Sequence, residues 1–308
     1  MACKSSFAPT GSAYNGLVHN LALAWFFLAL RVVFLGLERP LGKKVVTGGS
    51  TAVGGFLFFG AAAVALLPAL IIFSFFHRPA SWAFLGYAFI TACLFIVPFV
   101  FYIKALQHGE VSVITPLYSF GTLLVFVLPV ILQGEPFTWM RFAGALLVFL
   151  GVFFLKPGVN PLQSLRNVAV DRGAQFILLN TTLIAVIRLI DNRMADLEPI
   201  HYALSCAILS GVFFGVAVLF LRKWREVMAV YRRRTRLVWA NGVVNGYAYV
   251  SLLAVLGFGL DLSVAEPVAN TSILLAVVLG YYMFGEKIQA RLIASVLMII
   301  GVFLLAFG

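Results

Sequence analysis

A series of about ten long apolar segments constrains this chain more than any other feature. Each holds about 20 residues with few charges, the length that an α-helix needs to cross the hydrocarbon core of a bilayer. The segments lack the alternation over about ten residues that marks the strands of a membrane barrel. We therefore expect an all-α, polytopic membrane protein. The expected spans run from Gly16 to Gly36, Thr51 to Phe75, Ser81 to Tyr102, Val111 to Leu132, Phe137 to Leu155, Gly173 to Ile190, Ile200 to Leu221, Leu237 to Leu256, Leu262 to Phe284 and Ile288 to Phe307.

Composition agrees with a lipid environment and argues against other classes. Hydrophobic residues make up 62% of the chain and charged residues 11%, whereas a soluble domain carries roughly 25% charged residues. The formal charge of +11 is gathered in short segments between the spans, so no nucleic-acid partner is expected. Cys3, Cys93 and Cys206 are too scattered for a disulfide framework or a metal site. The expected partners are the bilayer and a small molecule, with no metal and no cofactor; a homodimer is compatible with the sequence.

The chain divides into two halves that resemble each other. A polar segment, residues 1–15, precedes the expected first repeat, 16–157; a connection, 158–172, leads to the second, 173–308. The stretch from Glu110 to Glu135 aligns without a gap with the stretch from Asp261 to Glu286. Five spans per repeat is an odd number, so the second repeat must be inverted, as in transporters whose substrate site lies near the membrane midplane. The aligned pairs are Ser112 with Ser263, Val113 with Val264, Pro116 with Pro267, Gly134 with Gly285, Glu135 with Glu286 and, after removal of one residue, Arg141 with Arg291 and Gly151 with Gly301.

These motifs carry a resemblance to a known family. Two five-span repeats, with a fourth span that ends in Gly-Glu and a fifth that ends in Gly-Val-Phe, resemble the EamA-type transporters of the drug/metabolite transporter superfamily. The resemblance implies that fold and the export or exchange of a metabolite or drug. Because the substrates of the family are diverse, it implies no particular cargo.

Two functional classes compete. The favoured one is a secondary transporter that works by alternating access, driven by protons or by exchange, because the chain lacks the phosphate-binding motif of an ATPase. The alternative is an integral membrane enzyme that acts on a lipid or isoprenoid. Such an enzyme needs clustered carboxylates or histidines, and the spans show no such cluster. We therefore expect a carrier without enzymatic activity.

The basic segment from Arg222 to Arg236 predicts the orientation. It carries seven Lys and Arg residues against one acid, Glu226, and positive residues collect on the cytoplasmic side. We expect this segment to be a cytoplasmic loop at the plasma (inner) membrane that serves as an insertion signal with no other role; contact with anionic lipids is the alternative. With ten spans, both termini then lie on the opposite side, whereas members of the resembled family are often drawn with cytoplasmic termini.

Polar residues inside the spans are the candidate site residues, because charge is costly in a bilayer. Glu266 precedes Pro267 in the ninth span, followed by Asn270 and Thr271. Glu266 is interpreted as a proton carrier, as the counter-charge of a cationic substrate, or as the structural partner of a nearby cation. Both prolines of the aligned stretches disturb a helix and are expected to face a central cavity. In the first repeat the corresponding residues are Thr115, Pro116, Tyr118 and Ser119.

Two further sets of polar residues are candidate site residues because of their positions within the spans. Asn241, Asn245 and Tyr249 recur at intervals of four and share one face of the eighth span, where they contact substrate or join helices. Arg31 and Arg188 occupy comparable places in the two halves. Each either extends to the membrane interface or faces the cavity, where it would attract anionic cargo.

Overall fold

The structure, a computed structural model, is helical throughout the part it describes. It describes residues 21–76, 82–109, 111, 117–118, 120–134, 137–151, 171–195, 198–285, 296–297, 299–301 and 303–304, and no strand occurs among them. The predicted all-α class is therefore confirmed for these residues. The helices are α1 Leu21–Val46, α2 Thr51–Phe76, α3 Ala83–His108, α5 Phe120–Gln133, α6 Trp139–Gly151, α8 Arg172–Ala195, α9 Pro199–Phe220, α10 Trp224–Gly257, α11 Leu262–Ala269 and α12 Ser272–Phe284.

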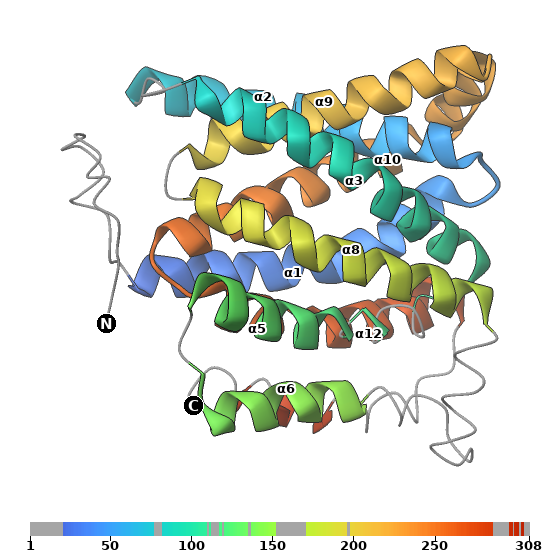
Figure 1. Cartoon of the computed structure of the whole chain (residues 1–308). Coiled ribbons are helices and arrows are strands. Elements are labelled where there is room, and N and C mark those ends of the chain that lie inside the picture. The colour runs from blue at the N-terminus through green and yellow to red at the C-terminus, as the bar shows by residue number, and fades with distance from the viewer. Residues whose placement is uncertain are drawn as a thin grey trace.

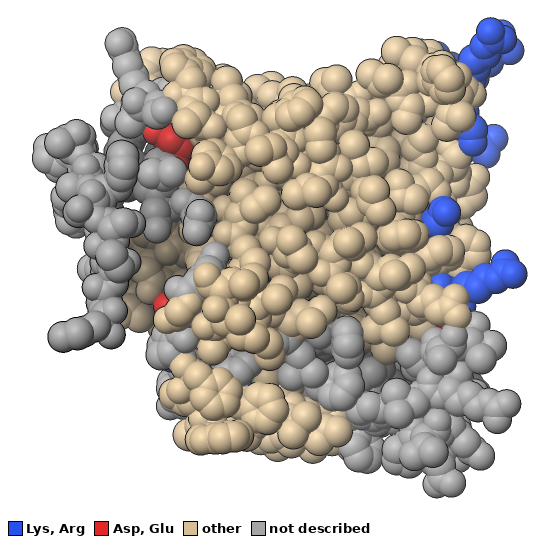
Figure 2. Space-filling model, viewed as in Figure 1, with Lys and Arg blue, Asp and Glu red and all other residues tan. Residues whose placement is uncertain are grey.

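The long helices lie side by side along one direction, with α2 and α9 at one edge of the bundle and α6 at the other (Figure 1). Within the described ranges, six of them (α1, α2, α3, α8, α9 and α10) are long and apolar enough to cross a membrane, by length and composition. Large apolar side chains cover the outside: Phe75 is 83% exposed and Phe220 88%. Lys and Arg gather at one end of the helices on the face in view (Figure 2). This surface fits a lipid-embedded bundle.

Small residues bring the helices of one layer close together. A Cβ atom added to Gly242 of α10 would lie 2.5 Å from the Cβ of Ala61 in α2, so the two backbones touch there. A Cβ added to Gly55 of α2 would lie 2.5 Å from the ring of Phe214 in α9. Such close approach replaces the hydrophobic effect as the main source of helix association in lipid. The layer of α2, α9 and α10 forms one wall of the cavity described below.

The first helix is longer than predicted. The expected span ended at Gly36, but α1 continues to Val46 through Glu38, Arg39 and Pro40. A run of charges normally marks the end of a span. Here Arg39 is only 2% exposed, because its side chain turns toward the interior.

The basic segment is helical, so the prediction of a loop there was wrong. Residues 224–236 form the first part of α10, which is bent at Arg234 (φ −133°, ψ 25°). The Arg234 guanidinium donates to the carbonyl oxygens of Lys44, Val45 (3.3 Å) and Thr47 (2.8 Å). The last carbonyls of a helix have no partner within that helix, so Arg234 satisfies the end of α1 and holds the bend in place.

The predicted ninth span is interrupted. α11 ends at Ala269 and α12 begins at Ser272, with Asn270 and Thr271 in a turn between them. The break follows Pro267 by three residues. The Thr271 amide donates to the Val268 carbonyl at 3.0 Å, the tighter three-residue pattern that commonly marks a helix end. The break places irregular backbone beside the buried Glu266.

Candidate functional site

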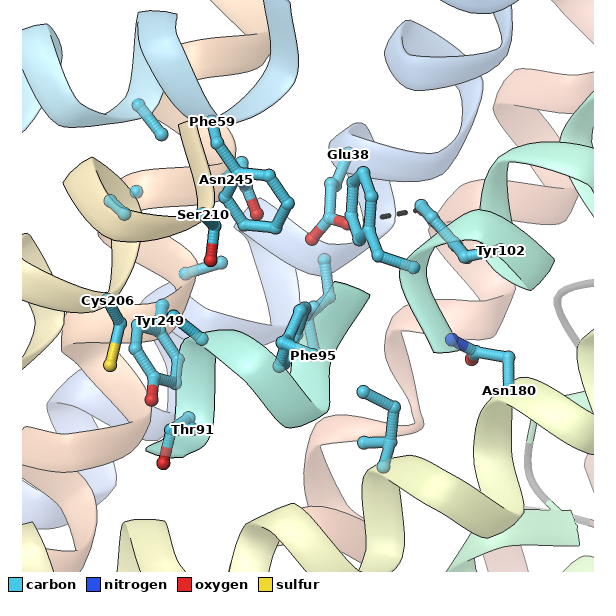
Figure 3. A pocket seen from close by; sticks show the side chains of 18 of the residues that line it. Glu38, Phe59, Thr91, Phe95, Tyr102, Asn180, Cys206, Ser210, Asn245 and Tyr249 are labelled. Atoms are coloured by element: carbon cyan, nitrogen blue, oxygen red, sulfur yellow. Dashed lines mark hydrogen bonds between the residues drawn. The ribbon is translucent and has the colours of Figure 1, made fainter. Parts of the chain in front are cut away.

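A cavity of about 100 Å³ lies between α1, α2, α3, α8, α9 and α10. Its wall is largely apolar and aromatic, with a few polar groups that point inward (Figure 3). This combination is typical of small-molecule sites, where apolar residues bury the ligand and a few polar groups orient it. The charged groups in the wall are Arg31, Glu38, Arg39 and Arg188, and the aromatic ones are Phe59, Phe95, Phe99, Tyr102, Tyr118 and Tyr249.

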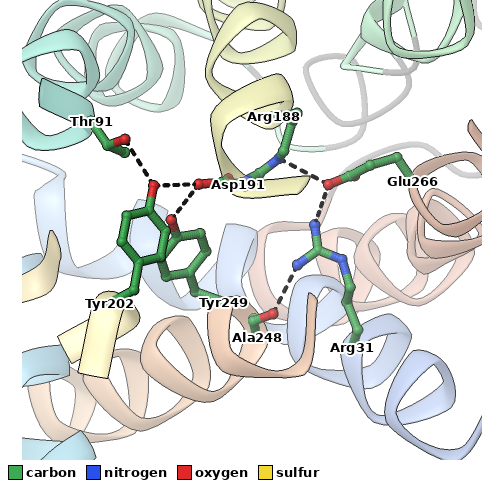
Figure 4. A network of polar contacts seen from close by, with 8 residues as sticks. All are labelled: Arg31, Thr91, Arg188, Asp191, Tyr202, Ala248, Tyr249 and Glu266. Carbon is green, nitrogen blue, oxygen red and sulfur yellow. Dashed lines mark hydrogen bonds and ion pairs between the residues drawn. The ribbon is translucent and has the colours of Figure 1, made fainter. Parts of the chain in front are cut away.

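One carboxylate holds two arginines at the edge of this cavity. Arg31 Nη2 of α1 donates to Glu266 Oε1 at 2.8 Å, and Arg188 Nε of α8 lies 2.9 Å from the same oxygen (Figure 4). Arg31 Nη1 also donates to the Ala248 carbonyl of α10 at 2.8 Å. All three charged side chains are less than 10% exposed. Glu266 therefore joins the first helix to two helices of the second half.

Asp191 is the second centre of the same network. Arg188 Nη1 donates to Asp191 Oδ2 at 2.7 Å. The hydroxyl groups of Tyr202 and Tyr249 both donate to Asp191 Oδ1, at 3.0 and 2.6 Å. Thr91 Oγ1 lies 2.8 Å from the Tyr202 hydroxyl and extends the network into α3. Because Asp191 is fully buried, these donors replace the water that its charge would otherwise require.

The network is neutral. Arg31 and Arg188 carry two positive charges, and Glu266 and Asp191 carry two negative charges. Desolvation of a charge is costly, so a buried set of this kind is stable only when every member is paired and hydrogen-bonded. Each of the four residues has a partner of opposite charge, although Arg31 Nε and Arg188 Nε are buried without a hydrogen-bond partner, and the four charges sum to zero.

Glu38 and Arg39 were missed by the sequence analysis, although both line the cavity. Glu38 Oε1 accepts a hydrogen bond from the Tyr102 hydroxyl at 3.2 Å. Arg39 Nη1 lies 3.5 Å from Ser272 Oγ, and its guanidinium lies 4.7 Å from the centre of the Tyr118 ring. Among the residues that the structure describes, neither has a partner of opposite charge at ion-pair distance. Their spacing from Arg31, seven and eight positions on, could have revealed the shared helix face.

Several predicted residues meet at the cavity. Arg31, Tyr118, Arg188, Asn245 and Tyr249 line its wall. Neither arginine extends to the membrane interface: Arg31 is 2% exposed and Arg188 7%.

A second, smaller cavity of about 10 Å³ adjoins the first. Glu266 and Asn270 line it together with Tyr118 and Arg188, which belong to both cavities. The shared Arg188 and Tyr118 thus connect the interrupted ninth span to the central cavity.

The remaining predicted residues lie elsewhere. Thr271 donates its hydroxyl to the Val268 carbonyl at 2.8 Å, within its own turn. Asn241 is buried against α1, where a Cβ on Gly42 would meet its side-chain oxygen at 3.5 Å, and it is not part of the cavity wall. Pro267 belongs to α11, and only its backbone is described. Thr115, Pro116 and Ser119 lie outside the described residues. In the described ranges, no three side chains of His, Cys, Asp or Glu come together as a metal site would require.

Two of three comparisons relate this chain to known proteins. Residues 22–156 match the EamA-like transporter family. The resemblance predicted from the sequence is confirmed for that part of the chain. A solved structure titled "Crystal structure of protein" is similar to this chain, with a TM-score of 0.64 and 14% identity over 94% of this chain and 98% of the other. At that identity the likeness concerns the fold alone. No curated protein matches the sequence.

Proposed function

From the match of residues 22–156 to the EamA-like transporter family, part of the drug/metabolite transporter superfamily, we propose that this protein is a secondary transporter that moves a small molecule across the membrane by alternating access. The observation that carries the proposal is the central cavity, where charged side chains of α1 and α8 meet inside a bundle of apolar helices. Charged residues at such a position are costly in lipid and are characteristic of substrate or ion pathways.

The proposed architecture is ten spans in two inverted repeats, 16–157 and 173–308. The matched segment lies within the first of them. Two aligned glycines support the repeat: Gly134 follows α5 with φ 71°, and Gly285 follows α12 with φ 68°. A left-handed residue at this position ends a helix and favours glycine. Gly301, the predicted counterpart of Gly151, packs against α6, where an added Cβ would lie 2.6 Å from the Gly144 carbonyl oxygen.

Alternating access in this architecture requires α1, in the first proposed repeat, to move relative to α8 and α11 of the second, because the cavity lies where the two proposed repeats meet. Glu266 is the common partner of both helices, so the opposite-facing state must either keep this carboxylate paired or offer the arginines new partners. These contacts favour the interpretation of Glu266 as the structural partner of nearby cations, here Arg31 and Arg188, over those of a proton carrier and of the counter-charge of a cationic substrate. Proton coupling and exchange both remain part of the proposal.

We propose the plasma (inner) membrane as the location, with the basic segment 222–236 on the cytoplasmic side and both termini opposite. The exposed Arg225, Arg232, Arg233 and Arg236 support this orientation. Arg39, by contrast, lines the cavity and is no evidence for the orientation.

The test is counterflow in proteoliposomes, with a labelled pool of amino acids, organic acids and amines. Ser210 of α9 lines the cavity and is 2% exposed, so Ser210→Phe fills the pathway. Ile208, on the outer side of the same helix, is 43% exposed, so Ile208→Phe is the matched control. A carrier shows saturable exchange that the Ser210 variant loses and the Ile208 variant keeps. Absence of exchange in the wild type, or equal loss in both variants, contradicts the proposal.

A further inference from the structure

The bend of α10 carries a group of arginines that the cavity does not use. Four of the five residues from 232 to 236 are arginines, and Arg234 is occupied by the carbonyl oxygens at the end of α1. The other three, Arg232, Arg233 and Arg236, are exposed and are called the bend cluster below. In the described part of the chain, no carboxylate lies at ion-pair distance from them. Their guanidinium groups therefore present unused hydrogen-bond donors to the surroundings of the protein.

The acid of the same segment is engaged elsewhere. Glu226 accepts a hydrogen bond from the Ser50 amide, and its carboxylate lies 3.8 Å from Lys223 Nζ. It therefore supplies no counter-charge to the bend cluster. Three neighbouring cations without a counter-charge create a positive potential that attracts an anion from outside the chain.

The bend cluster adjoins an apolar outer face of α10. Arg236, Trp239 and Val243 recur at intervals of three and four, so they share one side of the helix. Trp239 is 37% exposed and Val243 42%, whereas Val238 is buried in the bundle. The indole of Trp239 also donates to the Tyr231 hydroxyl at 3.2 Å, across the bend. Because tryptophan and tyrosine collect where hydrocarbon meets headgroups, this side places the arginines at headgroup level.

We propose that the bend cluster binds the phosphate of an anionic phospholipid, whose acyl chains lie along Trp239 and Val243. A guanidinium group binds phosphate through two parallel hydrogen bonds. The apolar row beside the cluster favours a lipid over a soluble anion, which could use the arginines alone. A zwitterionic lipid carries a cationic group that weakens its attraction to the cluster. The inference requires only that the bundle spans a membrane and is independent of the cargo.

The test measures lipid binding to the full chain purified in detergent. The protein is titrated with phosphatidylglycerol or phosphatidylcholine of identical acyl chains, and native mass spectrometry gives the fraction of chains that retain lipid. We expect phosphatidylglycerol to bind at least about tenfold more tightly. Glycerol phosphate, which has the anionic group without acyl chains, should not displace the lipid at equal concentration.

Two substitutions separate the charged and apolar parts of the site. In the triple variant R232Q/R233Q/R236Q, the affinity for phosphatidylglycerol falls to that for phosphatidylcholine, which is unchanged. In Trp239→Ala, both affinities fall while the preference for phosphatidylglycerol remains. A misfolded protein would lose both lipids and the preference together, so this crossed pattern identifies recognition.

A second triple variant, R172Q/R222Q/R225Q, is the matched charge control, because it removes three exposed arginines outside the bend cluster. It should keep the preference for phosphatidylglycerol. Equal loss of preference in the two triple variants would show diffuse attraction to the whole basic end and overturn the site. Equal binding of the two lipids by the wild type, or displacement by glycerol phosphate, would overturn it as well.

Discussion

Arg31 and Arg188 contact the same oxygen of Glu266, at 2.8 and 2.9 Å, although they belong to α1 and α8. One carboxylate thus compensates two buried cations, and Asp191 supplies the remaining negative charge through Arg188. Because both arginines depend on one acid, the acid matters more than either arginine alone. This dependence gives the first prediction.

We expect Glu266→Gln to destabilise the protein strongly, because it leaves two buried guanidinium groups with a neutral amide between them. Loss of one partner of a buried ion pair costs about 3–5 kcal/mol. The thermal midpoint in detergent measures the effect. Asp261→Asn, at the start of α11 and paired with Arg141 only at 3.8 Å, is the control and is expected to change the midpoint little. Equal midpoints for the two variants would show that Glu266 carries no structural charge.

Tyr249→Phe removes one hydroxyl from the fully buried Asp191. A hydrogen bond to a charged group contributes about 1.5–3 kcal/mol, and we expect a loss of that size in the free energy of unfolding. Tyr247→Phe on the same helix is the matched control, since its ring packs against Phe34 and no hydrogen bond of its hydroxyl is described. Urea or thermal unfolding in detergent compares the two. An equal effect of both substitutions would argue against Asp191 as the centre of the network.

Arg234→Gln is expected to release the end of α1. The carbonyl oxygens of Lys44, Val45 and Thr47 lose their donor, so the last turn of α1 opens more often. Hydrogen exchange measured by mass spectrometry should therefore quicken in the peptide that covers residues 43–49. Arg233→Gln, at the exposed neighbouring position, should leave that peptide unchanged. If hydrogen exchange in this peptide is unchanged in the Arg234 variant, Arg234 does not cap α1.

Gly242→Ala tests the close contact of α10 with α2. The added methyl would lie 2.5–2.8 Å from Ala61 atoms, two of them backbone, so the helices must separate. Overpacking of this kind costs about 1–3 kcal/mol, and the thermal midpoint should fall. Gly86→Ala in α3 has no atom within 4 Å of the new methyl and should be neutral or stabilising, because alanine favours a helix. A Gly242 variant as stable as the Gly86 variant would contradict the packing.

Sequence reasoning placed most helices because length and apolarity alone determine them. The expected second span, Thr51 to Phe75, differs from α2 by one residue, and the expected seventh, Ile200 to Leu221, differs from α9 by one at each end. The same reasoning misplaced the end of α1, because it treats a run of charges as an exit from the membrane. Whether these charges leave the membrane or enter the protein depends on which face of α1 carries Glu38 and Arg39. The hydropathy of the segment does not show which face that is.

The site could be predicted only as separate polar positions. Glu266, Arg31 and Arg188 were chosen individually because each is costly inside a span. Arg31 and Glu266 are 235 residues apart, so their pairing depends on how the helices pack and not on any local pattern. The contact of Asp191 with Tyr202 likewise depends on how the helices pack. Asn241 was grouped with Asn245 because residues four apart share a helix face. In the packed bundle, however, the Asn241 side chain lies near Gly42 of α1 and outside the cavity wall.

The contacts of α1 have a mechanical consequence. The helix is held at its middle by the ion pair between Arg31 and Glu266 and at its end by Arg234, and Glu38 and Arg39, which also line the cavity, lie between these contacts. A rigid rod held at two points cannot swing about one of them while the other stays closed. A tilt of α1 away from α10 and α11 would therefore have to break at least one of these two sets of contacts.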